Sequence, residues 1–305
     1  FVQTGGTVIN TSTTGAIEFA GASAQNLTML SGAHGTNTIS VRVNNAAGVN
    51  LTADMSIRNL TLTNGSVTGA GVLSYGASSL LTYNSSTGAQ TINATEFPAT
   101  NGPASLTINN TTASPNNTVT LNAARSLGAT GVLTLTNGFL VNGANTLTIA
   151  NPAVGGISGG SATTHVKGAL SRNLASGLVS GSTYIFPVGV SGYNPFALVN
   201  PTTNAGANVN VKITVSDSGT SGTASGLLAS LNTNRSWLSE VTDAGGNFTG
   251  SLVRLTDTPG AANAVGFSAD GGLTYNLVGG TNATVTGTDI TTTAPAATNI
   301  NGYFA

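Results

Sequence analysis

The residues of this chain that could support acid–base or metal chemistry are few and far apart. The 305 residues include two histidines, His34 and His165, no cysteine and nine carboxylates. The carboxylates are Glu18, Asp54, Glu96, Asp217, Glu240, Asp243, Asp257, Asp270 and Asp289. The absence of cysteine excludes disulfides, thiolate metal sites and a cysteine nucleophile. Neither histidine has a neighbouring carboxylate at a spacing typical of a triad or zinc site, so both are interpreted as structural or surface residues.

Glycoside hydrolysis would need two facing carboxylates. Glu240 and Asp243 are the closest pair in sequence, but three residues of separation place them on opposite faces of a strand. Calcium would need clustered oxygen ligands, whereas Asp243–Asn247 and Asp270–Gly272 are isolated acidic turns. Hairpin turns explain both segments, with calcium binding as the alternative. We therefore predict no catalytic, metal or cofactor site, and we expect a protein that is not an enzyme.

The composition narrows the possible partners. Only 6% of the residues are charged and the formal net charge is −1, so no basic face is available for nucleic acid or anionic lipid. No apolar run is long enough to span a bilayer. Abundant Thr, Asn and Gly with little charge favour an extracellular bacterial protein. The first ten residues have neither a charged nor an apolar signal region, so we expect a signal peptide to have been removed.

The elements that would position any site are short β-strands. From Leu133 to Ile149 apolar and small polar residues alternate, which predicts a strand with one buried face. Asn137-Gly138 and Asn142–Asn145 interrupt this pattern with residues typical of turns, so we predict three strands joined by two tight corners.

Imperfect repeats indicate how these strands are arranged. Val49–Gly71 parallels Val119–Asn145, because each has a short strand, then Leu-Thr-Leu-Thr-Asn-Gly, then a corner containing Gly and Ala. This pattern favours a β-solenoid, and an antiparallel sandwich is the alternative. Thr61/Thr63 and Thr134/Thr136 locally resemble the threonine ladders of ice-binding faces, but the pattern is not sustained along the sequence.

The amino-acid composition and the strand pattern change after a glycine-rich segment, Gly155–Ser161. Beyond it aromatic residues and proline become more frequent, Val209–Val215 alternates clearly, and acidic turns recur. We predict an all-β protein with a solenoid-like repeat region at residues 1–160 and an antiparallel β-sandwich at residues 161–305.

Several segments resemble a known group of proteins. Ser86–Asn110 and Gly131–Leu140 are similar to repetitive β-rich regions of large secreted surface proteins of Bacteroidota. His165–Leu174, Tyr184–Leu198, Asn234–Thr242 and Asn301–Ala305 resemble, in order, the module that commonly follows them. The resemblance implies export by the type IX secretion system, although the sorting domain of such cargo is not visible. This group of proteins includes adhesins, filaments and enzymes, so the resemblance does not indicate a particular activity.

The leading hypothesis is a non-enzymatic extracellular structural protein that assembles with copies of itself into a surface filament, fibre or adhesive stalk. The uncharged, apolar ends of the sequence would make contacts between copies, unless they complete their own domains. The candidate contact residues are Phe1, Val2, Val8, Ile9, Ile300, Tyr303 and Phe304. The alternative is a surface protein that binds or degrades carbohydrate, with Trp237, Tyr193 and Tyr275 stacking on glycan rings. A third possibility is a spacer within a longer chain.

Overall fold

The computed structural model describes residues 15–29, 39–243, 246–257, 263–279, 282–294 and 296–305. The chain divides into two units, one of residues 1–151 with 155–159 and the other of residues 152–154 with 160–305. The first is a β-solenoid and the second consists of antiparallel sheets, which confirms the predicted fold class. The candidate contact residues Phe1, Val2, Val8 and Ile9, and also His34, lie outside the described residues.

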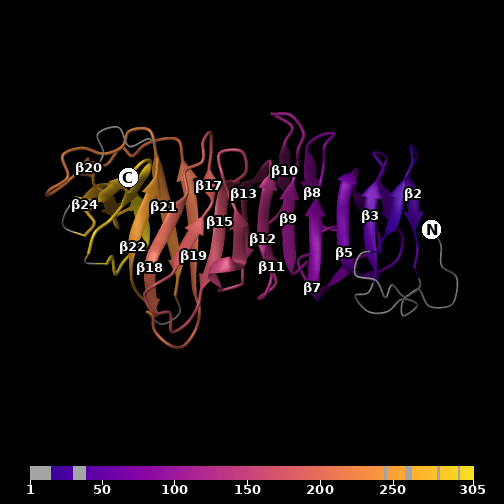
Figure 1. Cartoon of the computed structure of the whole chain (residues 1–305), viewed down its shortest axis with the longest axis horizontal. Helices are drawn as coiled ribbons and strands as arrows, with labels where there is room; N and C mark the ends of the chain where they lie inside the picture. Colours follow the sequence, from indigo (N-terminus) through magenta and orange to yellow (C-terminus); the bar gives the residue numbers. More distant parts are fainter. Residues whose placement is uncertain (1–14, 30–38, 244–245, 258–262, 280–281, 295) are drawn as a thin grey trace. The chain divides into compact units, whose positions relative to one another are not determined.

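The solenoid winds through about seven turns, each of which contributes one strand to a seven-stranded parallel sheet, and Figure 1 shows its central strands side by side. Its elements are β1 (Ile17–Ala20), β2 (Gln25–Leu27), β3 (Ser40–Asn44), β4 (Val49–Leu51), β5 (Met55–Asn64), β6 (Val67–Gly69), β7 (Leu73–Tyr83), β8 (Gln90–Ile92), β9 (Ser105–Asn109), β10 (Thr118–Leu121), β11 (Arg125–Leu127), β12 (Leu133–Asn137), β13 (Phe139–Ile149) and β14 (Ile157–Gly159). The order in the large sheet is β1-β3-β5-β7-β9-β12-β14.

The core of the solenoid consists of columns of side chains that repeat from turn to turn. One column contains Val41, Leu60, Leu81, Leu106 and Leu133, all buried. The next contains Phe19, Val43, Leu62, Tyr83, Ile108 and Leu135. Because inward and outward side chains alternate along each strand, the sequence alternation places one apolar residue of each turn on top of the last. Tyr83 is the one residue of these columns that carries a polar group.

The outward-facing column of the same strands begins with two charged residues, Glu18 on β1 and Arg42 on β3, and continues with threonines. Thr61, Thr82, Thr107 and Thr134 pair in register on four successive turns and form a single column. Two residues further along, Asn84 and Asn109 replace a second threonine on two of these turns, so the Thr-x-Thr pattern is not sustained, as the sequence indicated.

An asparagine ladder links three turns at the ends of strands of the same sheet. Asn109 Nδ2 donates to Asn84 Oδ1 at 2.6 Å, and Asn137 Nδ2 donates to Asn109 Oδ1 at 2.7 Å. Replacing Asn109 by alanine would leave one oxygen and one amide unpaired in the ladder. We expect a loss of about 1–3 kcal/mol in the free energy of unfolding, measured by urea denaturation. Asn122→Ala, at an exposed position outside the ladder, is the control. Equal losses in the two variants would show that the ladder adds nothing.

The corners depend on close approach between backbones. Gly65 follows β5, has φ +81°, and a Cβ placed there would lie 1.9 Å from the carbonyl oxygen of Asn45 in the preceding turn. Glycine is therefore required at this corner, both for the left-handed backbone and for the space.

The second unit contains two sheets, and Figure 1 shows β18 and β22 of one and β19 and β21 of the other. A short 3-10 helix, η1 (Val154–Gly156), spans the boundary between the two units in the sequence. The strands of the second unit are β15 (Val166–Leu174), β16 (Thr183–Phe186), β17 (Val188–Gly189), β18 (Phe196–Thr203), β19 (Val209–Ser216), β20 (Thr223–Ala224), β21 (Ser236–Thr242), β22 (Phe248–Thr256), β23 (Gly266–Ser268), β24 (Thr274–Leu277), β25 (Thr284–Thr286), β26 (Asp289–Thr291) and β27 (Gly302–Phe304). One sheet runs β20-β24-β23-β27-β21-β19-β15, and the other runs β16-β18-β22-β26-β25. Most pairs are antiparallel, whereas β15–β17 and β20–β24 are parallel.

Aromatic side chains fill the space between these two sheets. The rings of Phe196 and Phe304, one from each sheet, pack edge to face with centroids 5.3 Å apart. Arg172 is also buried, and its guanidinium donates to the carbonyl oxygens of Ile185, Ala153 and Val154. Burial lowers the pKa of Arg172 to about 10. Its charge therefore holds three backbone carbonyls of this unit together.

Candidate functional site

An interruption in strand pairing brings a carboxylate and other polar side chains into the solenoid interior. On one side β2, β4 and β6 form a three-stranded parallel sheet, whereas β8 pairs with β10 in another sheet. β6 and β8 belong to successive turns but do not pair with each other. One edge of β6 would therefore carry unpaired backbone groups inside the protein, which is costly in free energy.

A tight turn after β8 brings polar side chains to this edge. The N–H of Phe97 donates to the carbonyl oxygen of Asn93 at 3.0 Å. Asn93 Oδ1 accepts hydrogen bonds from the N–H groups of Thr95, at 2.9 Å, and Glu96, at 3.0 Å. An asparagine that bonds the backbone two and three residues further on is a common way to fix a turn. As a result Glu96 points inward and is 0% exposed.

Two side chains of this turn replace the missing neighbour of β6. The N–H of Val67 donates to Glu96 Oε1 at 2.8 Å, and Asn93 Nδ2 donates to the carbonyl oxygen of Val67 at 3.0 Å. Both backbone groups of Val67 are thus satisfied by side chains at the edge where a strand would otherwise lie.

Two tyrosines complete the environment of Glu96. Tyr83 Oη donates to Glu96 Oε2 at 2.6 Å, and Tyr75 Oη donates to the Glu96 carbonyl oxygen at 2.6 Å. Burial raises the pKa of Glu96 from 4.5 to about 7, although the hydrogen bonds from Tyr83, Val67 and Asn93 oppose this rise. Burial, and then the charge of Glu96, raise the pKa of both tyrosines well above the ordinary value. The carboxylate therefore changes protonation near neutral pH, while the phenols stay protonated.

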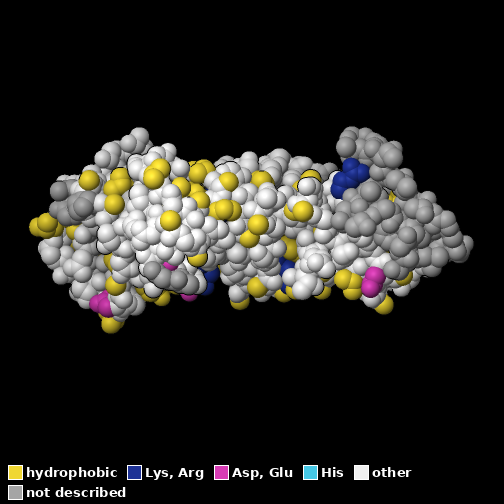
Figure 2. All heavy atoms as spheres, turned by 90° about the horizontal axis from the view of Figure 1, so that it is seen from below, with side chains coloured by type: hydrophobic (Ala, Val, Ile, Leu, Met, Phe, Trp, Pro, Cys, Tyr) yellow, Lys and Arg dark blue, Asp and Glu magenta, His cyan; other side chains and the backbone are white. Residues whose placement is uncertain are grey.

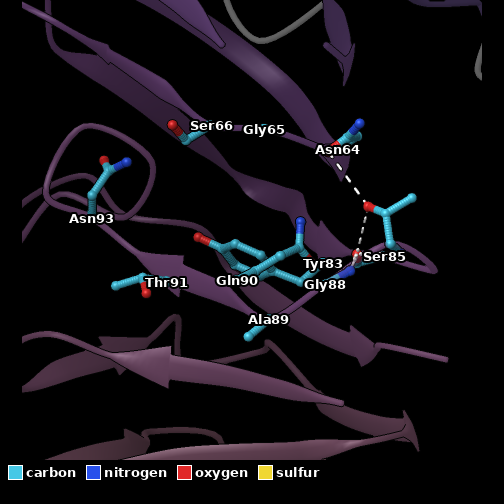
Figure 3. Close-up of a pocket in the computed structure, with 11 residues that line it drawn as sticks. Asn64, Gly65, Ser66, Tyr83, Ser85, Gly88, Ala89, Gln90, Thr91 and Asn93 are labelled. Carbon is cyan, nitrogen blue, oxygen red and sulfur yellow. Dashed lines mark hydrogen bonds between the residues drawn. The ribbon is translucent and has the colours of Figure 1, made fainter. Parts of the chain in front are cut away.

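Beside this cluster, a pocket of about 410 Å³ opens between the two sheets. Figure 3 shows Asn64, Gly65 and Ser66 on one side and Ala89 and Thr91 on the other. Tyr83, Gln90 and Asn93 also line it. The pocket is the open part of the same interruption, because its walls come from the residues before β6 and from β8 with its flanks.

The arrangement around Glu96 fits structural support better than acid–base catalysis. Its carboxylate is occupied by Val67 and Tyr83, and its hydrogen-bond partners include no second carboxylate. Across the described residues, no group of three or more His, Asp and Glu side chains could hold a metal ion. On the face seen in Figure 2, the charged side chains are few and scattered.

Three titratable residues of the second unit, His165, Glu240 and Asp243, occupy ordinary structural positions. His165 is buried, its Nδ1 lies 3.1 Å from the carbonyl oxygen of Ser161, and burial lowers its pKa. Glu240 forms an ion pair with Lys212, whereas Asp243 accepts a hydrogen bond from the N–H of Phe248. The structure does not bring Glu240 and Asp243 to a common partner.

The acidic turn at Asp270 is closed by its own backbone. Asp270 Oδ1 accepts from the N–H groups of Leu273, at 3.1 Å, and Thr274, at 3.0 Å. Hydrogen bonds from Ser268 and Thr274 lower the pKa of Asp270 to about 2. These contacts are those of a hairpin turn.

The candidate contact residues near the C-terminus belong to the second unit's own sheet. β27 lies between β21 and β23, Phe304 and Ile300 are buried, and Tyr303 is half-buried. These residues complete their own domain in the structure, which was the alternative to a role in contacts between copies.

The aromatic residues considered for glycan stacking are largely enclosed. Trp237 is 1% exposed and donates through Nε1 to the carbonyl oxygen of Asn194 at 3.0 Å, while Tyr275 is 0% exposed. Tyr193 is half-buried and packs near His165. The two buried rings offer no face for stacking on a sugar.

A second cavity, of about 580 Å³, lies in the second unit and is lined by Trp237, Leu255 and Ile290. Asp257, Asn263 and Asn282 also line it, and each adjoins a segment outside the described residues. Its walls are therefore only partly described, and no site is assigned to it.

The sequence reasoning missed Glu96, Asn93 and Tyr83 as a cluster. The available signal was a lone carboxylate in a neutral stretch, Thr91–Pro98, three residues after an asparagine. That spacing is typical of a side-chain-stabilised turn, but it does not say where the turn points.

No protein-family model matches the chain, and the searches of curated proteins and of solved structures also gave no match. Within the described residues, no helix is long and apolar enough to cross a membrane.

Proposed function

We propose that this chain is a non-enzymatic structural protein of an extracellular bacterial surface, which assembles with copies of itself into a filament, fibre or stalk. The observation that carries the proposal is the pair of uncharged ladders on the seven-stranded sheet, the threonines from Thr61 to Thr134 and the asparagines from Asn84 to Asn137. The threonine column and the asparagine ladder repeat with the spacing of the strands, roughly 4.8 Å.

These ladders suit contact between copies. Thr61, Thr82, Thr107 and Thr134 present hydroxyl groups in one line, and the asparagine ladder runs along the strand ends. Two copies could approach along these ladders without repulsion between like charges, because the threonines and asparagines are uncharged. The charged residues of the same column, Glu18 and Arg42, lie on β1 and β3. Ladders of backbone and side-chain hydrogen bonds along the solenoid would also resist extension along its axis.

Strand edges supply a second means of association. β1 and β2 end their sheets among the described residues, and each is paired there on one side. An edge strand offers backbone groups to a strand of another molecule, which is the usual basis of strand addition. The extracellular location belongs to the same proposal and is supported by the low charge content and by the resemblance to secreted surface proteins of Bacteroidota.

The test is negative-stain electron microscopy of the purified protein together with multi-angle light scattering. We expect regular filaments whose mass grows with protein concentration. Thr82→Lys combined with Thr107→Lys places two positive charges on the threonine column and should reduce assembly at least tenfold at low ionic strength. The matched control is Asn122→Lys with Thr130→Lys, which adds the same charge at exposed positions outside this sheet.

Strictly monomeric particles at the highest soluble concentration would overturn the proposal. Equal assembly by the two double variants would show that the threonine column is not the contact surface. In that case, if the Thr82/Thr107 variant forms filaments, the edges of β1 and β2 would be the next candidates for the contact between copies. If the chain is instead a spacer within a longer protein, we expect monomers. The same light-scattering measurement therefore distinguishes a spacer from a self-assembling subunit.

A further inference from the structure

The pocket between β6 and β8 has features of a binding site that the self-assembly proposal does not use. It exists because the two strands do not pair, and Glu96 and Asn93 fill only the part of the gap next to Val67. The rest stays open as a cavity of about 410 Å³, within the range of roughly 300–1,000 Å³ typical of small-molecule sites.

The lining of the pocket excludes two classes of ligand. All of its lining residues are described and none is charged. A phosphate or carboxylate would lose its hydration there without gaining an opposite charge, which is strongly unfavourable. A purely apolar ligand would remove water from amides and hydroxyls without replacing their hydrogen bonds. The polar side chains of the lining are Asn64, Ser66, Tyr83, Ser85, Thr87, Gln90, Thr91 and Asn93.

Gln90 supplies an oriented hydrogen-bond acceptor. Its Nε2 donates to the carbonyl oxygen of Leu62 at 3.1 Å, which fixes the amide. Its Oε1 is buried and accepts no hydrogen bond from the described protein. An acceptor that has lost its water and has no protein donor is a free-energy cost that a ligand hydroxyl would remove. Tyr83 lies beside it in Figure 3, but its ring is 1% exposed and offers no face for stacking.

The rim is held in place before any ligand arrives. Ser85 Oγ accepts from the N–H groups of Thr87 and Gly88, both at 3.2 Å. Thr87 Oγ1 donates to Asn64 Oδ1 at 3.4 Å, which joins the segment before β8 to the end of β5. A rim fixed in this way lowers the entropy cost of binding.

We propose that this pocket binds a neutral saccharide unit, with its hydroxyls on Gln90 and the rim amides. A neutral sugar combines many hydrogen-bonding groups with apolar ring edges, which is the chemistry of this lining. An extended peptide fits less well, because both backbone groups of Val67 on the open edge of β6 are already bound by Glu96 and Asn93.

The test uses saturation-transfer NMR and calorimetry on the full chain with cellobiose, maltose, N,N′-diacetylchitobiose and methyl β-D-glucoside. We expect at least one of them to bind, and the glucuronide counterpart of methyl glucoside to bind at least tenfold more weakly than the glucoside. Ala89→Trp fills the pocket without removing a hydrogen bond and should reduce affinity at least tenfold. Ala144→Trp, at an exposed alanine on β13, is the matched control and should bind as the parent does.

Gln90→Leu tests the acceptor itself, and we expect at least a tenfold loss of affinity. Thermal unfolding of every variant shows that the fold is retained. No binding by any of the four sugars at 50 mM, or binding that Ala89→Trp leaves unchanged, would overturn the proposal. Binding of an uncharged alternating peptide such as Thr-Val-Thr-Val-Thr-Val in place of the sugars would overturn it in favour of strand addition. None of these outcomes depends on filament formation.

Discussion

Gly65→Ala is expected to lower the free energy of unfolding by about 3 kcal/mol or more, whereas Gly143→Ala lowers it by about 1–2 kcal/mol. Both glycines lie in the solenoid and have positive φ, +81° at Gly65 and +56° at Gly143. A Cβ at Gly65 would lie 1.9 Å from the carbonyl oxygen of Asn45, whereas a Cβ at Gly143 has nothing within 4 Å. Gly143→Ala therefore measures the cost of a left-handed backbone alone, and the additional loss in Gly65→Ala measures the cost of the steric clash with Asn45.

The physical reason is that the Asn45 oxygen cannot move freely. The Asn45 N–H donates to the carbonyl oxygen of Asn64, and the Asn45 carbonyl accepts from the N–H of Gly48, so both turns would have to separate locally. Urea unfolding followed by circular dichroism measures both variants. If the two alanine variants lose equal stability, the close approach of successive turns at this corner is not a constraint.

The solenoid could be predicted from the sequence because its physical signal is local. Strands such as Leu133–Asn137 alternate with period 2 and end at Asn-Gly corners, and the structure places β12 there. The second predicted corner, at Asn142–Asn145, does not interrupt β13, which continues to Ile149. Its partner changes from β10 to β11 along this length, so the turn-like residues mark a change of partner and not an end of the strand.

Register between turns could not be predicted in the same way. The threonine column joins residues separated by unequal numbers of positions, from Thr61 to Thr82 and from Thr107 to Thr134. A fixed period in the sequence therefore does not reveal it. The column forms because inward residues such as Leu81 and Leu106 stack, and this stacking aligns the outward residues beside them.

The Glu96 cluster was beyond prediction for a different reason. A lone carboxylate in a neutral chain is usually exposed. Glu96 is buried because β6 lacks a neighbour strand on one edge, and that fact depends on how β8 pairs elsewhere. Trp237 and Tyr275 lie in the core, which is the usual position of large aromatic residues in a β-sandwich. The composition alone could not decide between this core position and an exposed position for glycan stacking.

The buried carboxylate gives the solenoid a pH dependence of stability that an exposed carboxylate would not. The pKa of Glu96 is about 7 in the folded protein against an ordinary value of 4.5, so the folded state holds a proton that the unfolded state releases. The contribution of Glu96 is therefore complete below about pH 4.5 and is lost as the pH rises through 7. At roughly 1.4 kcal/mol per pKa unit, the loss is about 3 kcal/mol between pH 4.5 and pH 8.

Glu96→Gln should remove this dependence, because glutamine resembles the protonated side chain. Its oxygen can accept from Val67 and its amide can donate to Tyr83 Oη, so we expect equal stability of variant and parent at pH 5. At pH 8 the variant should be more stable by about 2–3 kcal/mol. Hydrogen exchange of peptides covering residues 55–110, measured from pH 5 to pH 8 and corrected for the intrinsic rate, reports the solenoid itself.

Two controls isolate the effect of Glu96. Glu18→Gln removes an exposed carboxylate of the same unit, whose partner is Arg42, and should leave the pH profile of the peptides unchanged. His165 acts in the opposite direction, because burial lowers its pKa and its contribution to stability is lost as the pH falls. His165 belongs to the second unit and is present in both proteins, so its contribution cancels when the pH profile of Glu96→Gln is compared with that of the parent. If the two proteins keep parallel pH profiles in peptides 55–110, Glu96 does not exchange its proton near neutral pH, and its role is confined to holding Val67 and Tyr83.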